Sequence, residues 1–82
     1  MNTIIKRSML DNTEVPNYEV FGTAVDFDEA VAKVKLSFIE EYGVLEDEIE
    51  DFFEDLLVVN KEANTIMFED VFSDNKYEFF VF

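Results

Sequence analysis

The chain has 82 residues, and we expect a single compact domain over residues 1–82. Because 49% of the residues are apolar and 16% are aromatic, the composition excludes a disordered acidic tail, which could not bury enough apolar surface to offset chain entropy. The 20 acidic and 6 basic residues give a net charge of -14, and the absence of Cys and His excludes disulfide scaffolds, thiolate nucleophiles and Cys-type zinc sites.

The chain begins with a pattern typical of a strand hairpin. Residues Thr3–Leu10 form the first predicted strand, and Tyr18–Val25, rich in β-branched and aromatic residues, forms the second. Between them, Asp11–Asn17 contains Asp, Asn and Pro, which favour turns.

A first helix is predicted over Phe27–Tyr42. Asp26 is suited to the N-cap, Glu29 completes a capping box, and Gly43 follows at a position that favours a left-handed C-terminal residue. One apolar face is expected to contain Phe27, Ala30, Val31, Val34, Phe38 and Tyr42. Ile39 lies to one side of this face and indicates contact with a second element.

A second helix is predicted over Leu45–Asp55. Its apolar stripe is expected to contain Leu45, Ile49, Phe52, Phe53 and Leu56. Across both helices we expect the buried residues to be Phe27, Val31, Val34, Phe38, Ile49, Phe52, Phe53 and Leu56.

Three further strands are predicted, at Leu57–Asn60, Asn64–Glu69 and Lys76–Phe82. Turns are expected at Asn60–Asn64 and at Ser73-Asp74-Asn75. The order is therefore ββααβββ, which predicts an α+β fold with an antiparallel sheet of about five strands and two helices on one face.

The last strand is unusual because Phe79-Phe80-Val81-Phe82 is apolar on both faces. Such a strand is either buried on both sides or covers an interface. The end of the chain is crowded with aromatic residues, namely Phe72, Tyr77, Phe79, Phe80 and Phe82. A sheet core explains them most simply, and a homodimer formed through residues 76–82 is the alternative.

The strongest functional signal is the run Glu40–Asp55, which has no Lys or Arg. Seven acids between Glu46 and Asp55, over a helix length of about 15 Å, give about one charge per 2 Å. Duplex DNA has one charge per roughly 1.7 Å of axis. Six of these acids form the predicted partner-binding surface: Glu46, Asp47, Glu50, Asp51, Glu54 and Asp55.

The like charges of this acidic surface are expected to lower the stability of the helix. The i, i+4 pairs Glu46/Glu50, Asp47/Asp51, Glu50/Glu54 and Asp51/Asp55 are all like-charged, and each costs a few tenths of a kcal/mol. A solvated helix face is the simplest explanation, but such faces usually mix Glu with Lys. Repeated departure from a local rule favours a functional role.

Catalysis and metal binding are not expected, and no cofactor is predicted. The Asp70–Asp74 run and the Asp26/Asp28 pair carry the oxygen ligands that Ca²⁺ prefers, but neither has the twelve-residue loop spacing of a calcium-binding hand. Paired carboxylates can hydrolyse glycosides, but a chain this short leaves little room for a cleft.

The charge indicates the sign of a partner. Anionic lipid and nucleic acid would both repel this chain, so we expect no membrane and no direct nucleic-acid binding, but a basic protein partner. No segment reaches the roughly 18 to 20 apolar residues of a membrane span, and no long apolar region follows Lys6 and Arg7 as in a secretory signal. The absence of Cys fits a reducing cytoplasm.

In its acidic run Glu40–Asp55, its small size and its lack of Cys and His, the chain resembles small phage-encoded inhibitors that mimic nucleic acid, of the anti-CRISPR or anti-restriction type. The resemblance is one of character, without a shared motif, and it covers only the acidic segment and the size. It implies an inhibitor that occupies the basic nucleic-acid groove of a host nuclease.

Two other functions remain open from the sequence. An immunity protein or antitoxin that blocks a basic toxin would use the same electrostatics, and a neighbouring toxin gene would distinguish it. A small accessory or structural domain of a phage or mobile element would need the charge only for solubility. An exposed aromatic patch without a salt-sensitive partner would favour that function.

Overall fold

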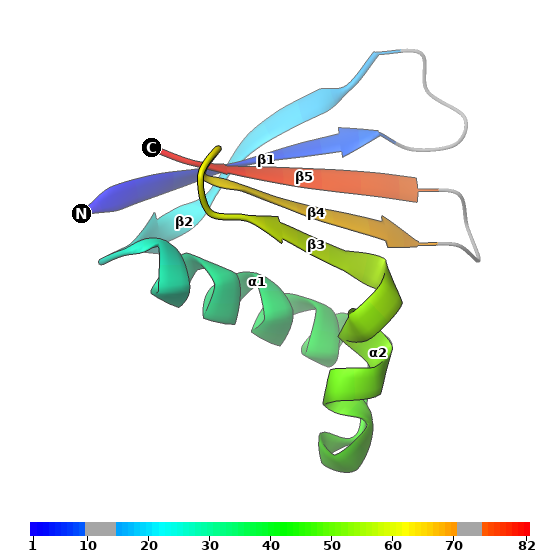
Figure 1. Ribbon diagram of the computed structural model, residues 1–82. Coiled ribbons are helices and arrows are strands. Elements are labelled where there is room, and N and C mark those ends of the chain that lie inside the picture. The colour runs from blue at the N-terminus through cyan, green and yellow to red at the C-terminus, as the bar shows by residue number, and fades with distance from the viewer. Residues whose placement is uncertain (10–14, 71–74) are drawn as a thin grey trace.

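The computed structural model describes residues 1–9, 15–70 and 75–82 and has the predicted ββααβββ order. Its elements are β1 (Asn2–Met9), β2 (Asn17–Ala24), α1 (Phe27–Tyr42), η1, a 3₁₀ turn (Glu46–Glu48), α2 (Ile49–Leu56), β3 (Leu57–Asn60), β4 (Thr65–Asp70) and β5 (Asn75–Val81). The five strands form one antiparallel sheet in the order β2-β1-β5-β4-β3. Both helices lie on one side of this sheet, which confirms the predicted α+β fold (Figure 1).

The strand boundaries lie within one residue of those predicted where the structure describes them. Leu10 and residues 11–14 of the predicted first turn lie outside the described residues, as do residues 71–74, which include Phe72, Ser73 and Asp74. The turn at Asn60–Asn64 is present, with the Asn60 side chain accepting a hydrogen bond from the Ala63 N–H and Asn64 in the left-handed region at φ 54°.

A bulge in β2 adds an aromatic ring to the helix-facing side of the sheet. Ile4 pairs with Gly22 and Ile5 pairs with Val20, which leaves Phe21 as the extra residue. The Phe21 ring meets Phe79 edge to face, with 5.1 Å between centroids.

Helix α1 begins and ends as its sequence predicts. The Asp26 carboxylate accepts a hydrogen bond from the Glu29 N–H at 2.8 Å, and Gly43 ends the helix in the left-handed conformation at φ 64°. The second half of the capping box is shifted, because the Glu29 carboxylate accepts from the Val25 N–H at 3.3 Å and not from that of Asp26.

The second helix starts later than predicted. Leu45 is extended, and residues 46–48 form the 3₁₀ turn η1, so the α-helix covers only Ile49–Leu56. Leu45 has no side-chain acceptor to cap a helix, and its side chain is exposed outside the apolar stripe. At the other end α2 passes directly into β3, where the Leu57 N–H still donates to the Phe53 carbonyl.

The core is built more from the sheet than the sequence indicates. Of the eight predicted core residues, Phe27, Val34, Phe38 and Phe53 are buried. The other four are only partly buried against them: Val31, Ile49, Phe52 and Leu56. The prediction that these four residues are buried is wrong, because no element of the described chain covers the outer flanks of α1 and α2. The strands and the start of α1 supply the remaining buried hydrophobic residues, Ile4, Ala24, Ala30, Ile66, Phe68, Tyr77, Phe79 and Val81.

Aromatic rings join the helix layer to the sheet. The Phe38 ring of α1 stacks on Phe68 of β4 with 3.9 Å between centroids and 17° between planes. Phe38 also lies 5.7 Å from Tyr77 and 5.9 Å from Phe79 on the neighbouring β5. Phe53 of α2 meets Phe68 at 6.3 Å, so both helices contact one ring.

We predict that Phe38→Ala destabilises the fold by about 3 to 5 kcal/mol, because it removes a fully buried ring and leaves a cavity. That is a large part of the stability of so small a domain. Thermal and urea unfolding followed by circular dichroism measure the loss. The control is Leu36→Ala on the exposed side of α1, which should change stability by less than about 0.5 kcal/mol. Equal effects of the two variants would contradict the assigned core.

Candidate functional site

The predicted partner-binding acids lie at the free end of the helix layer. Glu46 and Asp47 lie in η1, and Glu50, Asp51, Glu54 and Asp55 lie in α2, and all six side chains are exposed. We call these six residues the acidic face. Helix α2 and the turn before it project away from the sheet at one end of α1 (Figure 1). The fold thus presents the acidic face on a protrusion.

The helix directs these acids outward because its other side is held by the core. Phe53 is buried, and Ile49, Phe52 and Leu56 are packed against the core cluster. At 100° per residue, the four acids of α2 occupy the opposite arc. Glu54 and Asp55 fall in the last turn of α2, where the helix dipole disfavours negative charge and no basic residue compensates.

Within the described residues, no Lys or Arg forms an ion pair with the acidic face. The ion pairs of the described residues lie elsewhere and are Lys6–Glu19, Arg7–Glu78 and Lys33–Glu29, at 4.0, 3.5 and 3.4 Å. Lys33 also donates to the Thr23 carbonyl, which holds it at the far end of α1. The acids of η1 and α2 therefore remain available to a basic partner.

The 3₁₀ turn changes two details of the sequence prediction. Only Glu50/Glu54 and Asp51/Asp55 lie wholly inside α2, so the other two like-charge pairs span the junction with η1. The tighter turn rises about 2.0 Å per residue, which lengthens the segment to about 17 Å and spaces the seven charges about 2.4 Å apart. This spacing is wider than in duplex DNA but of the same order.

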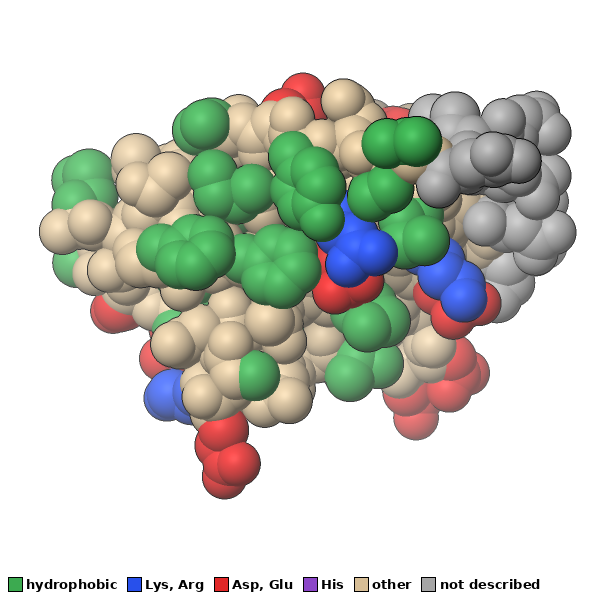
Figure 2. Space-filling view, turned by 90° about the horizontal axis from the view of Figure 1, so that it is seen from above, with side chains coloured by type: hydrophobic (Ala, Val, Ile, Leu, Met, Phe, Trp, Pro, Cys, Tyr) green, Lys and Arg blue, Asp and Glu red, His purple; other side chains and the backbone are tan. Residues whose placement is uncertain are grey.

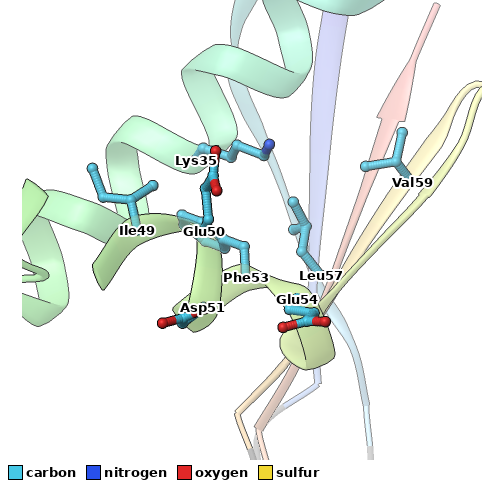
Figure 3. Close-up of a pocket in the computed structure, with 8 residues that line it drawn as sticks. All are labelled: Lys35, Ile49, Glu50, Asp51, Phe53, Glu54, Leu57 and Val59. Carbon is cyan, nitrogen blue, oxygen red and sulfur yellow. The ribbon is translucent and has the colours of Figure 1, made fainter. Parts of the chain in front are cut away.

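A shallow hollow of about 450 Å³ lies beside the acidic face. Its lining residues come from α1, α2 and β3 and are Lys35, Ile49, Glu50, Asp51, Phe53, Glu54, Leu57 and Val59. Figure 3 shows Glu50 extending from α2 on the side of Lys35, whereas Asp51 points away. The Lys35 ammonium lies 5.9 Å from the centroid of the Phe53 ring.

This hollow combines an apolar floor with an acidic rim. Ile49, Phe53, Leu57 and Val59 can contact an aliphatic stem, while the carboxylates of Glu50 and Glu54 can meet a cationic head group. An Arg or Lys side chain has this two-part character.

A second hollow, bordered by Tyr42, Gly43, Val44, Glu48, Asp51 and Phe52, lies near the C-terminal end of α1. The Tyr42 hydroxyl donates a hydrogen bond to the Asp70 carboxylate at 2.8 Å, and Asp70 is buried. Burial, this hydrogen bond and the negative charge of Asp70 raise the pKa of Tyr42 above its ordinary value. Burial and the charge of Glu41 raise the pKa of Tyr77 as well.

Two of the acids considered as calcium ligands have structural roles, and a third, Asp28, is exposed on α1. Asp26 caps α1 and Asp70 accepts from Tyr42, while residues 71–74 of the second candidate lie outside the described residues. Within residues 1–9, 15–70 and 75–82, no group of three or more acidic side chains is arranged to hold a metal ion.

The predicted aromatic strand lies at the centre of the sheet, and its two faces differ. Tyr77, Phe79 and Val81 are buried beneath the helices. Phe80 and Phe82 point to the opposite side, where their rings lie 6.5 Å apart and Phe82 is 74% exposed. Of the two possibilities that the sequence left open for this strand, burial on both sides is excluded, because both helices cover the same face.

The side of the sheet away from the helices forms a second candidate surface, which we call the open sheet face. Figure 2 shows hydrophobic side chains spread across it, with basic and acidic side chains lying together among them. Two rows of paired residues cross it, one with Val20, Ile5, Phe80 and Thr65, the other with Tyr18, Arg7, Glu78, Met67 and Val58.

Sequence reasoning missed most of this surface. It attributed the exposed apolar patch to residues 76–82 alone, whereas Val20, Tyr18, Met67 and Val58 come from three other strands. The signal was present in the period of two along β2, where Tyr18 and Val20 alternate with polar residues. Their common side becomes evident only when the strand order is known.

Comparison with protein-family models, with curated proteins and with solved structures found no match for this chain. None of the helices in the described part of the chain is both long enough and apolar enough to cross a bilayer.

We predict that the melting temperature rises between low and moderate NaCl concentration. The acidic face repels itself because no described cation pairs with it, and salt screens this repulsion with a Debye length of about 10 Å at 0.1 M. Thermal unfolding in a NaCl series measures the shift. A melting temperature that stays flat or falls would show that the acids are already neutralised.

We predict that Tyr42→Phe lowers stability by about 1.5 to 3 kcal/mol at neutral pH, since it removes a hydrogen bond to a carboxylate. The raised pKa of Tyr42 stabilises the fold below pH about 10, and this stabilisation is lost as the pH rises further. As the pH rises above 10, the variant should therefore lose less stability than the wild type does. The loss that remains in the variant comes from ionisation of Tyr77, whose pKa is also raised. Urea unfolding from pH 7 to 11 measures both effects.

The matched control is Tyr18→Phe, at an exposed ring, which should change stability by less than about 0.5 kcal/mol. If Tyr42→Phe is as stable as the wild type throughout the series from pH 7 to 11, the hydrogen bond between Tyr42 and Asp70 does not stabilise the protein.

Proposed function

We propose that this chain is a nucleic-acid-mimic inhibitor whose acidic face occupies the basic DNA- or RNA-binding groove of a bacterial defence nuclease. The observation that carries the proposal is the dense, exposed and unneutralised row of carboxylates on a protruding 3₁₀ turn and helix. The proposed setting is the bacterial cytoplasm, where such nucleases and their substrates meet.

The shape of the protrusion supports insertion into a groove. A single helix has a diameter of about 10 to 12 Å with its side chains, which is narrower than a nucleic-acid duplex, so α2 can enter a protein groove that accommodates one. Because α2 is held to the body through its apolar side, its four acids are presented on a packed helix and not on a free loop. Rigid presentation lowers the entropy lost when a partner binds.

The hollow beside α2 supports recognition of individual basic side chains. A Lys or Arg of the partner can lay its stem over Phe53 and Leu57 and bring its charge to Glu50 or Glu54. Lys35 is the only basic residue among those lining the hollow, and the partner's cation would have to share the site with it.

Blocking a basic toxin is the second function that this electrostatic surface supports. Both functions predict binding that weakens with salt, but only a nucleic-acid mimic must compete with DNA or RNA for its partner. Competition therefore separates them.

We predict that reversing Glu50, Asp51 and Glu54 to Lys abolishes binding to a basic partner, because three acceptors are lost and three repulsive charges are gained. Wild-type protein, immobilised and exposed to bacterial lysate at low salt, should retain a nuclease that a salt gradient or added duplex DNA releases. The triple variant should retain none. It should fold at least as well as the wild type, since three of the four like-charge i, i+4 pairs become opposite-charge pairs.

The matched control reverses three exposed acids elsewhere, Glu19, Asp28 and Glu62, and changes the net charge by the same amount. It should bind nearly as well as the wild type. Equal loss in both variants would show that net charge alone attracts the partner. Undiminished binding by the Glu50, Asp51 and Glu54 variant would show that α2 is not the interface.

A further inference from the structure

The open sheet face is the part of the described surface where apolar side chains gather without helices above them. Val20 is 69% exposed and Phe82 is 74% exposed, and Ile5 and Phe80 lie partly exposed between them. A patch of this kind on a small protein marks an interaction surface.

The charge of the open sheet face contrasts with that of the whole chain. The strand registers place two basic residues, Arg7 and Lys76, and two acidic residues, Glu69 and Glu78, on this side. The described strands therefore make this face neutral, although the chain has a net charge of -14. It is the face through which two copies of so acidic a chain can approach with the least repulsion.

The centre of this face holds an ion pair whose guanidinium is poorly satisfied. An Arg7 terminal nitrogen lies 3.5 Å from a Glu78 oxygen, longer than a good charged hydrogen bond. The other terminal nitrogen donates to the Met9 sulfur, a weak acceptor, and the Arg7 Nε is buried without a partner in the described structure. A further carboxylate brought to Arg7 would improve this site.

We propose that the open sheet face is the interface of a homodimer, in which a second copy of this chain packs sheet to sheet. A two-fold axis parallel to the strands and between β1 and β5 sets Arg7 opposite Glu78 of the second copy, and Ile5 opposite its Phe80. Strands β1 and β5 are neighbours, and within one copy Arg7 is paired with Glu78 and Ile5 with Phe80. The two-fold axis therefore brings the members of both pairs face to face across the interface. Aligned sheets pack about 10 Å apart in this manner.

The size of the open sheet face limits the area that a dimer can bury. Five strands at about 4.8 Å spacing and about seven residues long at about 3.3 Å per residue bury about 1,000 Å² in total over both copies. This is near the lower limit of specific interfaces, where weak complexes are found, so we expect a weak dimer with a Kd of roughly micromolar order. Salt strengthens it, because the remaining charge of each copy repels the other.

This inference is independent of the proposed function, and the two are tested by opposite effects of salt. Partner binding by the acidic face weakens with NaCl, whereas dimerisation through the open sheet face strengthens. Loss of one leaves the other measurable.

The decisive experiment mixes two charge-reversal variants, Arg7→Glu and Glu78→Arg, and follows mass by sedimentation equilibrium and native mass spectrometry. Each variant alone places like charges across the two-fold axis and should dimerise at least about tenfold more weakly than the wild type. In the mixture, each Glu of one copy faces an Arg of the other, so heterodimers should form at wild-type strength. The ion pair within each copy stays broken in the mixture, so recovery reports contact between copies.

A second pair of variants tests the apolar part of the face. Val20→Lys should weaken the dimer at least about tenfold, and Leu36→Lys, an equally charged change at an exposed residue of α1, should leave it intact. Circular dichroism verifies that all four variants are folded. A wild type that stays monomeric up to about 1 mM, well above the micromolar range expected from the area, would overturn the proposal. A dimer that withstands Val20→Lys, or a mixture without heterodimers, would also overturn it and leave the face to a different protein.

Discussion

The stack of Phe38 on Phe68 is the contact on which the arrangement of this protein depends. It joins the middle of α1 to β4 at 3.9 Å between ring centroids, and both rings are fully buried. Because Phe53 packs against the same Phe68 ring, the position of α2 follows from the position of this stack. Hydrophobic burial at one point therefore holds both the helix layer and the acidic protrusion, in a chain that has no disulfide to assist it.

The one-sided helix layer also determines how the two candidate surfaces are separated. Both helices cover the same side of the sheet, so the acids of α2 point away from the body while the other side of the sheet remains open (Figures 1 and 2). One surface is dense in charge and the other is neutral and apolar. A dimer formed through the open sheet face would leave both acidic faces outward, and a partner with two basic grooves would then be bound with added avidity.

Local sequence signals predicted the elements because they act over a few residues. The Asp26 cap, the left-handed Gly43 and the turn at Asn64 determine where α1 and the β3–β4 hairpin begin or end. Sequence signals failed where contacts between residues far apart in the chain determine the structure. Neither the 3₁₀ turn after Leu45 nor the partial exposure of Phe52 follows from helical periodicity, because both depend on how far α2 can pack over β4. The acidic residues were found from sequence alone, whereas the open sheet face required the placement of β5 between β1 and β4.

The central claim is that cationic groups bind at the acidic face in preference to the other acids of the chain. Titration of isotope-labelled protein with a nona-arginine peptide, followed by amide chemical shifts in NMR spectra, tests it most directly. The account predicts that the largest shifts fall within residues 46–57 and around Lys35, that they shrink as NaCl is added, and that Asp28 and Glu62 shift little. Shifts of equal size at all exposed acids would contradict the account, because they would show a diffuse attraction to net charge and no binding site.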